Sequence, residues 1–174
     1  MTADTIERGR YDEAAHCLFY LLYWGCCFLG TGTDKKDLMG LRSYPQAVQD
    51  AVRKQPALAA AAPKPQPLWK ILLSNLLMFT VIFSVLGRAL RGPLGLTDYG
   101  SAFWYLLALG EGLGLFDLLV IDLLWWRNTR RIRFSFLPEK QLYQDPATHI
   151  GSFVRGIPLF AAIAALSAGI VTLL

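Results

Sequence analysis

Three acidic side chains lie within an otherwise apolar stretch, LLALGEGLGLFDLLVIDLLWW, at residues 106–126. They are Glu111, Asp117 and Asp122. A charged side chain at the centre of a membrane costs roughly 2.5–3.5 kcal/mol on insertion scales, so such acids face a helix-bundle interior or a wet cavity and often bind a proton, cation or cationic substrate. They could instead only hold helices together, because polar contacts between membrane helices contribute about 0.6–2 kcal/mol.

Helical spacing sorts these acids into two directions. On an α-helix Glu111 and Asp122 are about three turns apart and share one face, whereas Asp117 is rotated by about 120–140° from both. Gly110 and Gly114 form a GxxxG spacing on the same segment. This spacing allows a second helix to approach closely beside Glu111.

Polar residues on a second apolar run are expected at the same depths in the membrane as the acids. If the runs at residues 68–87 and 103–126 pack antiparallel, Lys70 lies level with Asp122 and Asn75 lies level with Asp117. We therefore predict an ion pair between Lys70 and Asp122. The candidate residues of an ion or substrate path are Glu111, Asp117, Asp122, Asn75 and Lys70.

The composition of the whole chain indicates a membrane protein. Its 174 residues are 54% hydrophobic, and the mean hydropathy is +0.37. Mostly apolar runs of about 20 residues are typical of helices that cross the roughly 30 Å hydrocarbon layer. We predict an all-α integral membrane protein, in which a tail at residues 1–13 precedes one four-helix transmembrane bundle at residues 14–174. The predicted spans are residues 14–30, 68–87, 103–126 and 157–174.

Basic residues set the predicted orientation. Lys and Arg are concentrated in the connections at residues 31–67 and 127–156, and short loops rich in these residues stay in the cytoplasm. Both termini are therefore expected outside, in a multi-pass protein of the cell membrane. This asymmetry accounts for the net charge of +4, so no nucleic-acid partner is expected. The layout resembles small bacterial multi-span proteins of the permease kind.

The first cytoplasmic loop contains a short predicted amphipathic helix. Ser43 is a possible cap, Pro45 suits a first helical position, and Pro56 limits the helix. This helix is expected to rest on the membrane or on a neighbouring loop, or to dock a cytoplasmic partner. Its apolar face consists of Ala47, Val48, Ala51 and Val52.

The second loop opens with a cluster of arginines directly after Trp125 and Trp126. Such a cluster suits contact with anionic lipid headgroups, or it simply anchors the third span in the membrane. Its members are Arg127, Arg130, Arg131 and Arg133.

The cysteines and histidines do not form a metal-binding pattern. The adjacent pair Cys26 and Cys27 cannot form an ordinary disulfide on a helix, and no CxxC spacing exists. His16 and His149 fall on opposite sides of the membrane in the predicted topology. No metal or other cofactor is therefore expected, and the chain lacks the G-x-S-x-G, H-E-x-x-H and Walker motifs.

Three functions remain open from the sequence. The first is a permease-like transporter, or the membrane subunit of one, in which the acids bind protons or cations. The second is an accessory or scaffolding subunit whose polar pairs are structural. The third is a metal-dependent enzyme that modifies lipids; on balance we expect no enzyme. A four-span chain is expected to work among membrane lipids as a homo-oligomer or in a larger complex, with a separate cytoplasmic ATPase subunit if ATP supplies the energy.

Overall fold

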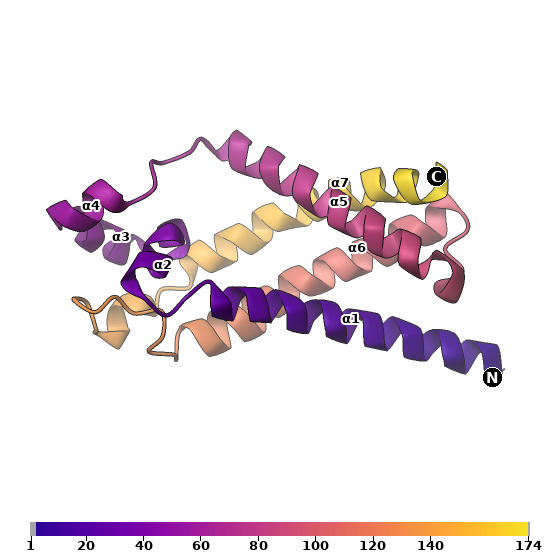
Figure 1. The fold of residues 1–174 in the computed structure, drawn as a ribbon, viewed down its shortest axis with the longest axis horizontal. Coiled ribbons are helices and arrows are strands. Elements are labelled where there is room, and N and C mark those ends of the chain that lie inside the picture. The colour runs from indigo at the N-terminus through magenta and orange to yellow at the C-terminus, as the bar shows by residue number, and fades with distance from the viewer. Residues whose placement is uncertain (1–2, 174) are drawn as a thin grey trace. The chain divides into compact units, whose positions relative to one another are not determined.

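The computed structural model describes residues 3–173, and the side chains of residues 6–173. This part of the chain is helical and contains no strand (Figure 1). It divides into two compact units. Unit 1 comprises Met1–Leu21, Gln66–Gly114 and Arg155–Leu174, and unit 2 comprises Leu22–Pro65 and Leu115–Val154. Three of the boundaries between the units fall inside long helices, and the fourth falls at residues 65/66, in the connection before the helix that begins at Leu68.

Each predicted span corresponds to a helix, and each helix extends beyond its predicted bounds at one end; the second ends at Leu94 rather than at residue 87, and the third begins at Tyr99 rather than at residue 103. The first begins near residue 3 rather than 14, because no proline precedes Gly30. The last begins directly after Pro146 rather than at residue 157. The long helices are α1 (Ala3–Leu29), α5 (Leu68–Leu94), α6 (Tyr99–Phe116) and α7 (Ala147–Leu173).

Two stretches of the described chain are long and apolar enough to cross a membrane. They are Leu68–Leu94 and Lys140–Leu173. A buried helix of a soluble protein can also reach this length and composition, so the four-span bundle at residues 14–174 stays a prediction.

The core of unit 1 is built from parts of four helices. Phe83 of α5 is fully buried, and its ring lies 5.9 Å from that of Phe19 on α1 and 6.1 Å from that of Phe160 on α7. Ser167 of α7 donates a hydrogen bond to the Thr80 carbonyl of α5 at 3.2 Å. The buried core residues are Phe83, Leu96, Ala102, Leu106, Leu109, Ile163, Ala164, Ala168 and Val171.

The close approach predicted beside Glu111 is confirmed at Gly110. A β-carbon built on Gly110 would lie 2.8 Å from the Phe160 ring and 3.2 Å from the Phe160 β-carbon. The ring therefore occupies the space that any larger residue would need. A β-carbon built on Gly169 of α7 would have no heavy atom within 4 Å.

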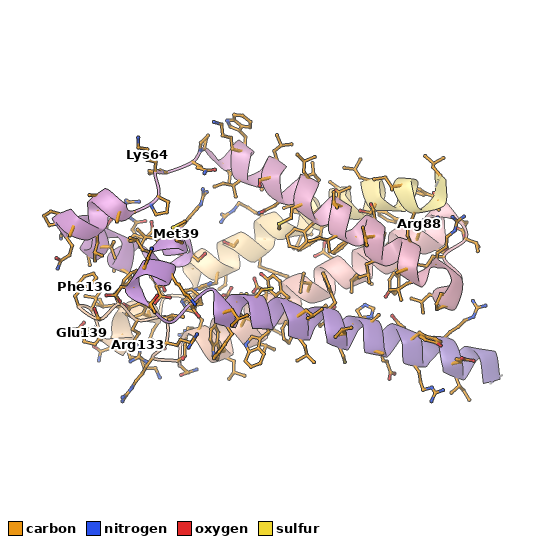
Figure 2. All side chains as sticks on the ribbon, viewed as in Figure 1. Met39, Lys64, Arg88, Arg133, Phe136 and Glu139 are labelled. Atoms are coloured by element: carbon orange, nitrogen blue, oxygen red, sulfur yellow. The ribbon has the colours of Figure 1, made fainter. Side chains whose placement is uncertain are left out.

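Unit 2 contains the short elements. They lie in the two connections that the sequence analysis assigned to the cytoplasm, and Figure 2 shows Met39, Arg133, Phe136 and Glu139 on them. The elements are α2 (Asp34–Met39), the 3-10 helix η1 (Leu41–Ser43), α3 (Gln46–Arg53), α4 (Pro56–Ala61) and the 3-10 helix η3 (Lys140–Tyr143).

A single small core joins the two connections. The Tyr44 hydroxyl donates to the Ile132 carbonyl at 2.8 Å, and the Ser135 amide donates to the Asp34 carboxylate at 2.8 Å. The predicted helix after Pro45 is confirmed as α3, with Pro45 just before its first residue. Its apolar face packs on the neighbouring connection. The core residues are Leu38, Leu41, Tyr44, Val48, Val52, Trp126, Ile132, Phe134 and Tyr143.

One carboxylate is buried at the edge of this core. Asp37 is 2% exposed, and its Oδ1 accepts a hydrogen bond from the Gly32 amide at 3.2 Å. Burial raises the pKa of Asp37 above its ordinary value of 3.8, and the Gly32 hydrogen bond only partly opposes this rise. The folded state therefore prefers the protonated acid.

We predict that Gly110→Ala lowers the free energy of unfolding by about 1 kcal/mol, because overpacking costs about 1–3 kcal/mol and the helix-propensity gain of Ala offsets part of that. Thermal unfolding in detergent micelles measures this. Gly169→Ala is the matched control and should be neutral or stabilising, since its β-carbon meets open space. Equal melting temperatures for the two variants would contradict the close contact with Phe160.

We also predict a pH-dependent effect of Asp37→Asn. A raised folded-state pKa means that Asp37 costs stability as the pH rises from about 3.8 through the raised value. The variant should therefore gain stability relative to the native chain as the pH rises above about 4. Denaturant unfolding at several pH values tests this. Asp50→Asn, at an exposed position of α3, controls for the loss of any carboxylate.

Candidate functional site

The segment that carries two of the predicted acids is a π-helix. It is η2 (Asp117–Trp126), which follows α6 directly. At its end the Arg127 amide donates to the Asp122 carbonyl, five residues back, at 3.3 Å. Single π turns occur frequently at functional sites. Here the wider helix brings Asp117 and Asp122, which are five residues apart, towards one face, which corrects the rotation expected for an α-helix.

Asp122 is paired with a histidine that the sequence analysis had placed in a loop. The Nδ1 atom of His149 lies 2.9 Å from Oδ2 of Asp122, and the two side chains are only 4% and 15% exposed. His149 stands in the first turn of α7. The apolar residues Ile150, Phe153 and Val154 continue the helical spacing after Pro146, and this signal could have identified the longer helix.

The second acid is hydrogen-bonded to the first helix of the chain. The Tyr23 hydroxyl of α1 donates to the Asp117 carboxylate and also hydrogen-bonds with Cys27, one turn further along α1. Asp117 lies close enough to interact electrostatically with both Asp122 and His149. Unit 2 therefore gathers five ionisable side chains. They are Tyr23, Cys27, Asp117, Asp122 and His149.

Two buried nitrogen atoms, one within this group and one on the neighbouring Trp126, have no hydrogen-bond partner. They are Nε2 of His149 and Nε1 of Trp126, on side chains that are 4% and 8% exposed. The two rings pack edge to face with centroids 5.9 Å apart. Buried polar atoms in native proteins are almost always hydrogen-bonded, so each unpaired nitrogen marks a place where a polar ligand can bind.

The other predicted path residues lie in unit 1. Glu111 is half-buried in α6, and Asn75 is half-buried in α5. Lys70 is exposed, and its ammonium group stands 5.5 Å from the ring centroid of Trp69. The predicted pairing of Lys70 with Asp122 stays a prediction, because the two residues lie in different units.

Part of the predicted lipid-contact cluster is engaged within unit 2. The Arg131 guanidinium donates to the Phe28 carbonyl at 3.1 and 3.2 Å and lies 4.0 Å over the Phe28 ring. Arg133 donates to the Pro138 carbonyl at 3.4 Å. Arg131 therefore satisfies the C-terminal end of α1, where a cation is favourable. Headgroup contact stays a prediction for all four arginines, of which Arg130 is exposed and the other three are half-buried.

Among the side chains described by the structure, no group of three or more His, Cys, Asp or Glu residues could hold a metal ion. Both carboxylates already accept hydrogen bonds, Asp117 from Tyr23 and Asp122 from His149. The chemistry that these groups can perform is proton binding and the neutralisation of a small cation.

The comparisons with known proteins add no identity. No protein-family model, no curated protein and no solved structure shows a significant match to the chain.

We predict that Tyr23→Phe lowers the free energy of unfolding by about 1 kcal/mol, because it removes the donor to a buried carboxylate. Thermal unfolding in detergent measures the change. Tyr11→Phe, at an exposed position of the same helix, is the matched control and should have no effect. A loss of similar size in both variants would show that the Tyr23 hydroxyl does not stabilise Asp117.

Proposed function

We propose that this chain is a small multi-span membrane protein of the permease kind, or the membrane subunit of a transporter. Its function would be to bind a proton or a small cation at Asp117 and Asp122. The observation that carries the proposal is the group of two carboxylates, one imidazole and one phenol within unit 2. Ionisable groups of this kind inside apolar helices mark ion and proton paths.

The exposed apolar surface of the long helices supports a membrane location. On α5, side chains four residues apart are between 45% and 67% exposed along one face. Soluble monomers rarely expose contiguous apolar patches of more than a few hundred Å². Lipid chains would cover such a face at no cost. The residues of this α5 face are Leu73, Leu77, Val81 and Val85.

The same kind of surface recurs on the other long helices. Leu18 and Leu22 are about 60% exposed on α1, and Leu166 and Ile170 are exposed on α7. In the proposed arrangement all four helices cross the membrane, both termini lie outside the cytoplasm, and the two connections of unit 2 lie inside it. With few spans, the protein would work as a homo-oligomer or in a complex, with an ATPase subunit as one possible energy source.

We predict that purified protein in vesicles carries protons or monovalent cations down an imposed gradient. Asp117→Asn and Asp122→Asn should each reduce this flux to that of empty vesicles, because each removes a carboxylate of the group. Internal pH-sensitive and cation-sensitive dyes measure the flux. Asp50→Asn is the matched control, since it neutralises an exposed acid of α3 that belongs neither to this group nor to the predicted path.

Two results would overturn the proposal. The first is that native vesicles carry no ion under any gradient, and the second is that the neutral variants carry as much as the native chain. If the variants only lower the melting temperature, the acids are structural and the accessory-subunit function takes precedence. The search would then turn to proteins that bind residues 31–67.

A further inference from the structure

Among the described side chains of this group, His149 alone has one ring nitrogen paired with a carboxylate and the other ring nitrogen buried without a hydrogen-bond partner. Its Nδ1 atom lies 2.9 Å from the Asp122 carboxylate. An ionised carboxylate only accepts hydrogen bonds, so Nδ1 carries a hydrogen and donates it. In the neutral ring this leaves Nε2 with a free lone pair, and Nε2 is buried without a partner.

We infer that the proton is the ion bound by this site and that Nε2 of His149 is the atom that carries it. This inference rests on the proposed function and narrows it from protons or cations to protons. It also assigns the central role to a residue outside the predicted ion path. The structure supports it by the fixed ring, the free lone pair and the burial of the pair.

The transfer step involves one N–H bond and no other covalent change. Nε2 accepts a proton from a water-borne hydronium ion, so an O–H bond breaks and an N–H bond forms, giving an imidazolium ring. The ring later returns the proton to water and becomes neutral again. Asp122 keeps its hydrogen bond with Nδ1 throughout, so the ring stays oriented in both states.

The surroundings of the ring can compensate the positive charge that it gains. Asp122 and Asp117 place two carboxylates in the same group, and Trp126 presents an aromatic ring 5.9 Å away. A cation close to an indole ring is attracted by its π electrons. The Trp126 Nε1–H group only donates, so it does not compete for the proton. Tyr23 and Cys27 of α1 are the other ionisable groups, and both interact with Asp117.

A metal cation is a poorer occupant of this position. Sodium-like and divalent ions need several oxygen ligands. The carboxylate of Asp117 already accepts a hydrogen bond from Tyr23, and that of Asp122 accepts one from His149. A proton at Nε2 leaves both of these hydrogen bonds in place, whereas a metal ion would displace them.

The chain provides a matched control in its second histidine. His16 of α1 also has its Nδ1 atom 2.9 Å from an aspartate, Asp12, but the two side chains are 24% and 47% exposed. The two pairs therefore share their chemistry and differ in burial. His16→Gln removes one imidazole without touching the group in unit 2.

The experiment measures proton and cation flux in vesicles that contain the native chain, His149→Gln or His16→Gln. We expect His149→Gln to abolish proton flux and His16→Gln to retain it. Imidazole ¹⁵N NMR of the same vesicles provides a second measurement, because the chain has 2 histidines and each variant removes one set of signals. The His149 Nε2 signal should change between bare and protonated nitrogen over the pH range in which the flux changes.

Each remaining outcome is decisive. Undiminished proton flux in His149→Gln overturns the inference, as does a His149 Nε2 signal that is unchanged while the flux varies with pH. Native vesicles that carry sodium or potassium but no protons keep the proposed function and overturn the inference. If His149→Gln does not fold, the NMR titration of the native chain decides alone. Vesicles that carry no ion overturn the proposed function itself, and the inference with it.

Discussion

The burial of ionised groups among apolar helices is the constraint on which unit 2 depends. A carboxylate that leaves water loses several kcal/mol of hydration, which only good partners can offset. Asp122 has His149 at 2.9 Å, and Asp117 has the Tyr23 hydroxyl. These partners come from α7 and α1, so both helices must extend to η2. The start of α7 at Ala147, ten residues before the predicted span, is consistent with this requirement because it places His149 on the helix.

The change from α6 to η2 is the local feature that makes the arrangement possible. In an α-helix, residues five apart point in different directions, and the two acids would need separate sets of partners. In the π-helix they turn towards one face, so the same small group of side chains can serve both. Two like charges at close range repel each other, and the histidine and the phenol are placed where they reduce that repulsion.

Sequence periodicity predicted the long helices well and their partners poorly. Apolar runs located α5 and α6, although α5 ends at Leu94 rather than at residue 87, and the spacing of Val48 and Val52 identified α3. Composition could not predict the π-helix, because the apolar residues of η2 are compatible with an α-helix as well as with a π-helix. The pairing of His149 with Asp122 was also out of reach, since the predicted loop ended at residue 156. Arg131 was assigned to lipid by its charge alone, whereas its contact with Phe28 depends on where α1 ends.

The segment between α4 and α5 is a suitable place to insert a tag. Residues 63–67 read PKPQP and are exposed, and Figure 2 shows Lys64 on them. Alternating prolines favour an extended, semi-rigid chain that resists collapse. No core residue of either unit lies within these five positions. An affinity tag or a fluorescent protein inserted there would report expression and location while both hydrophobic cores stay intact.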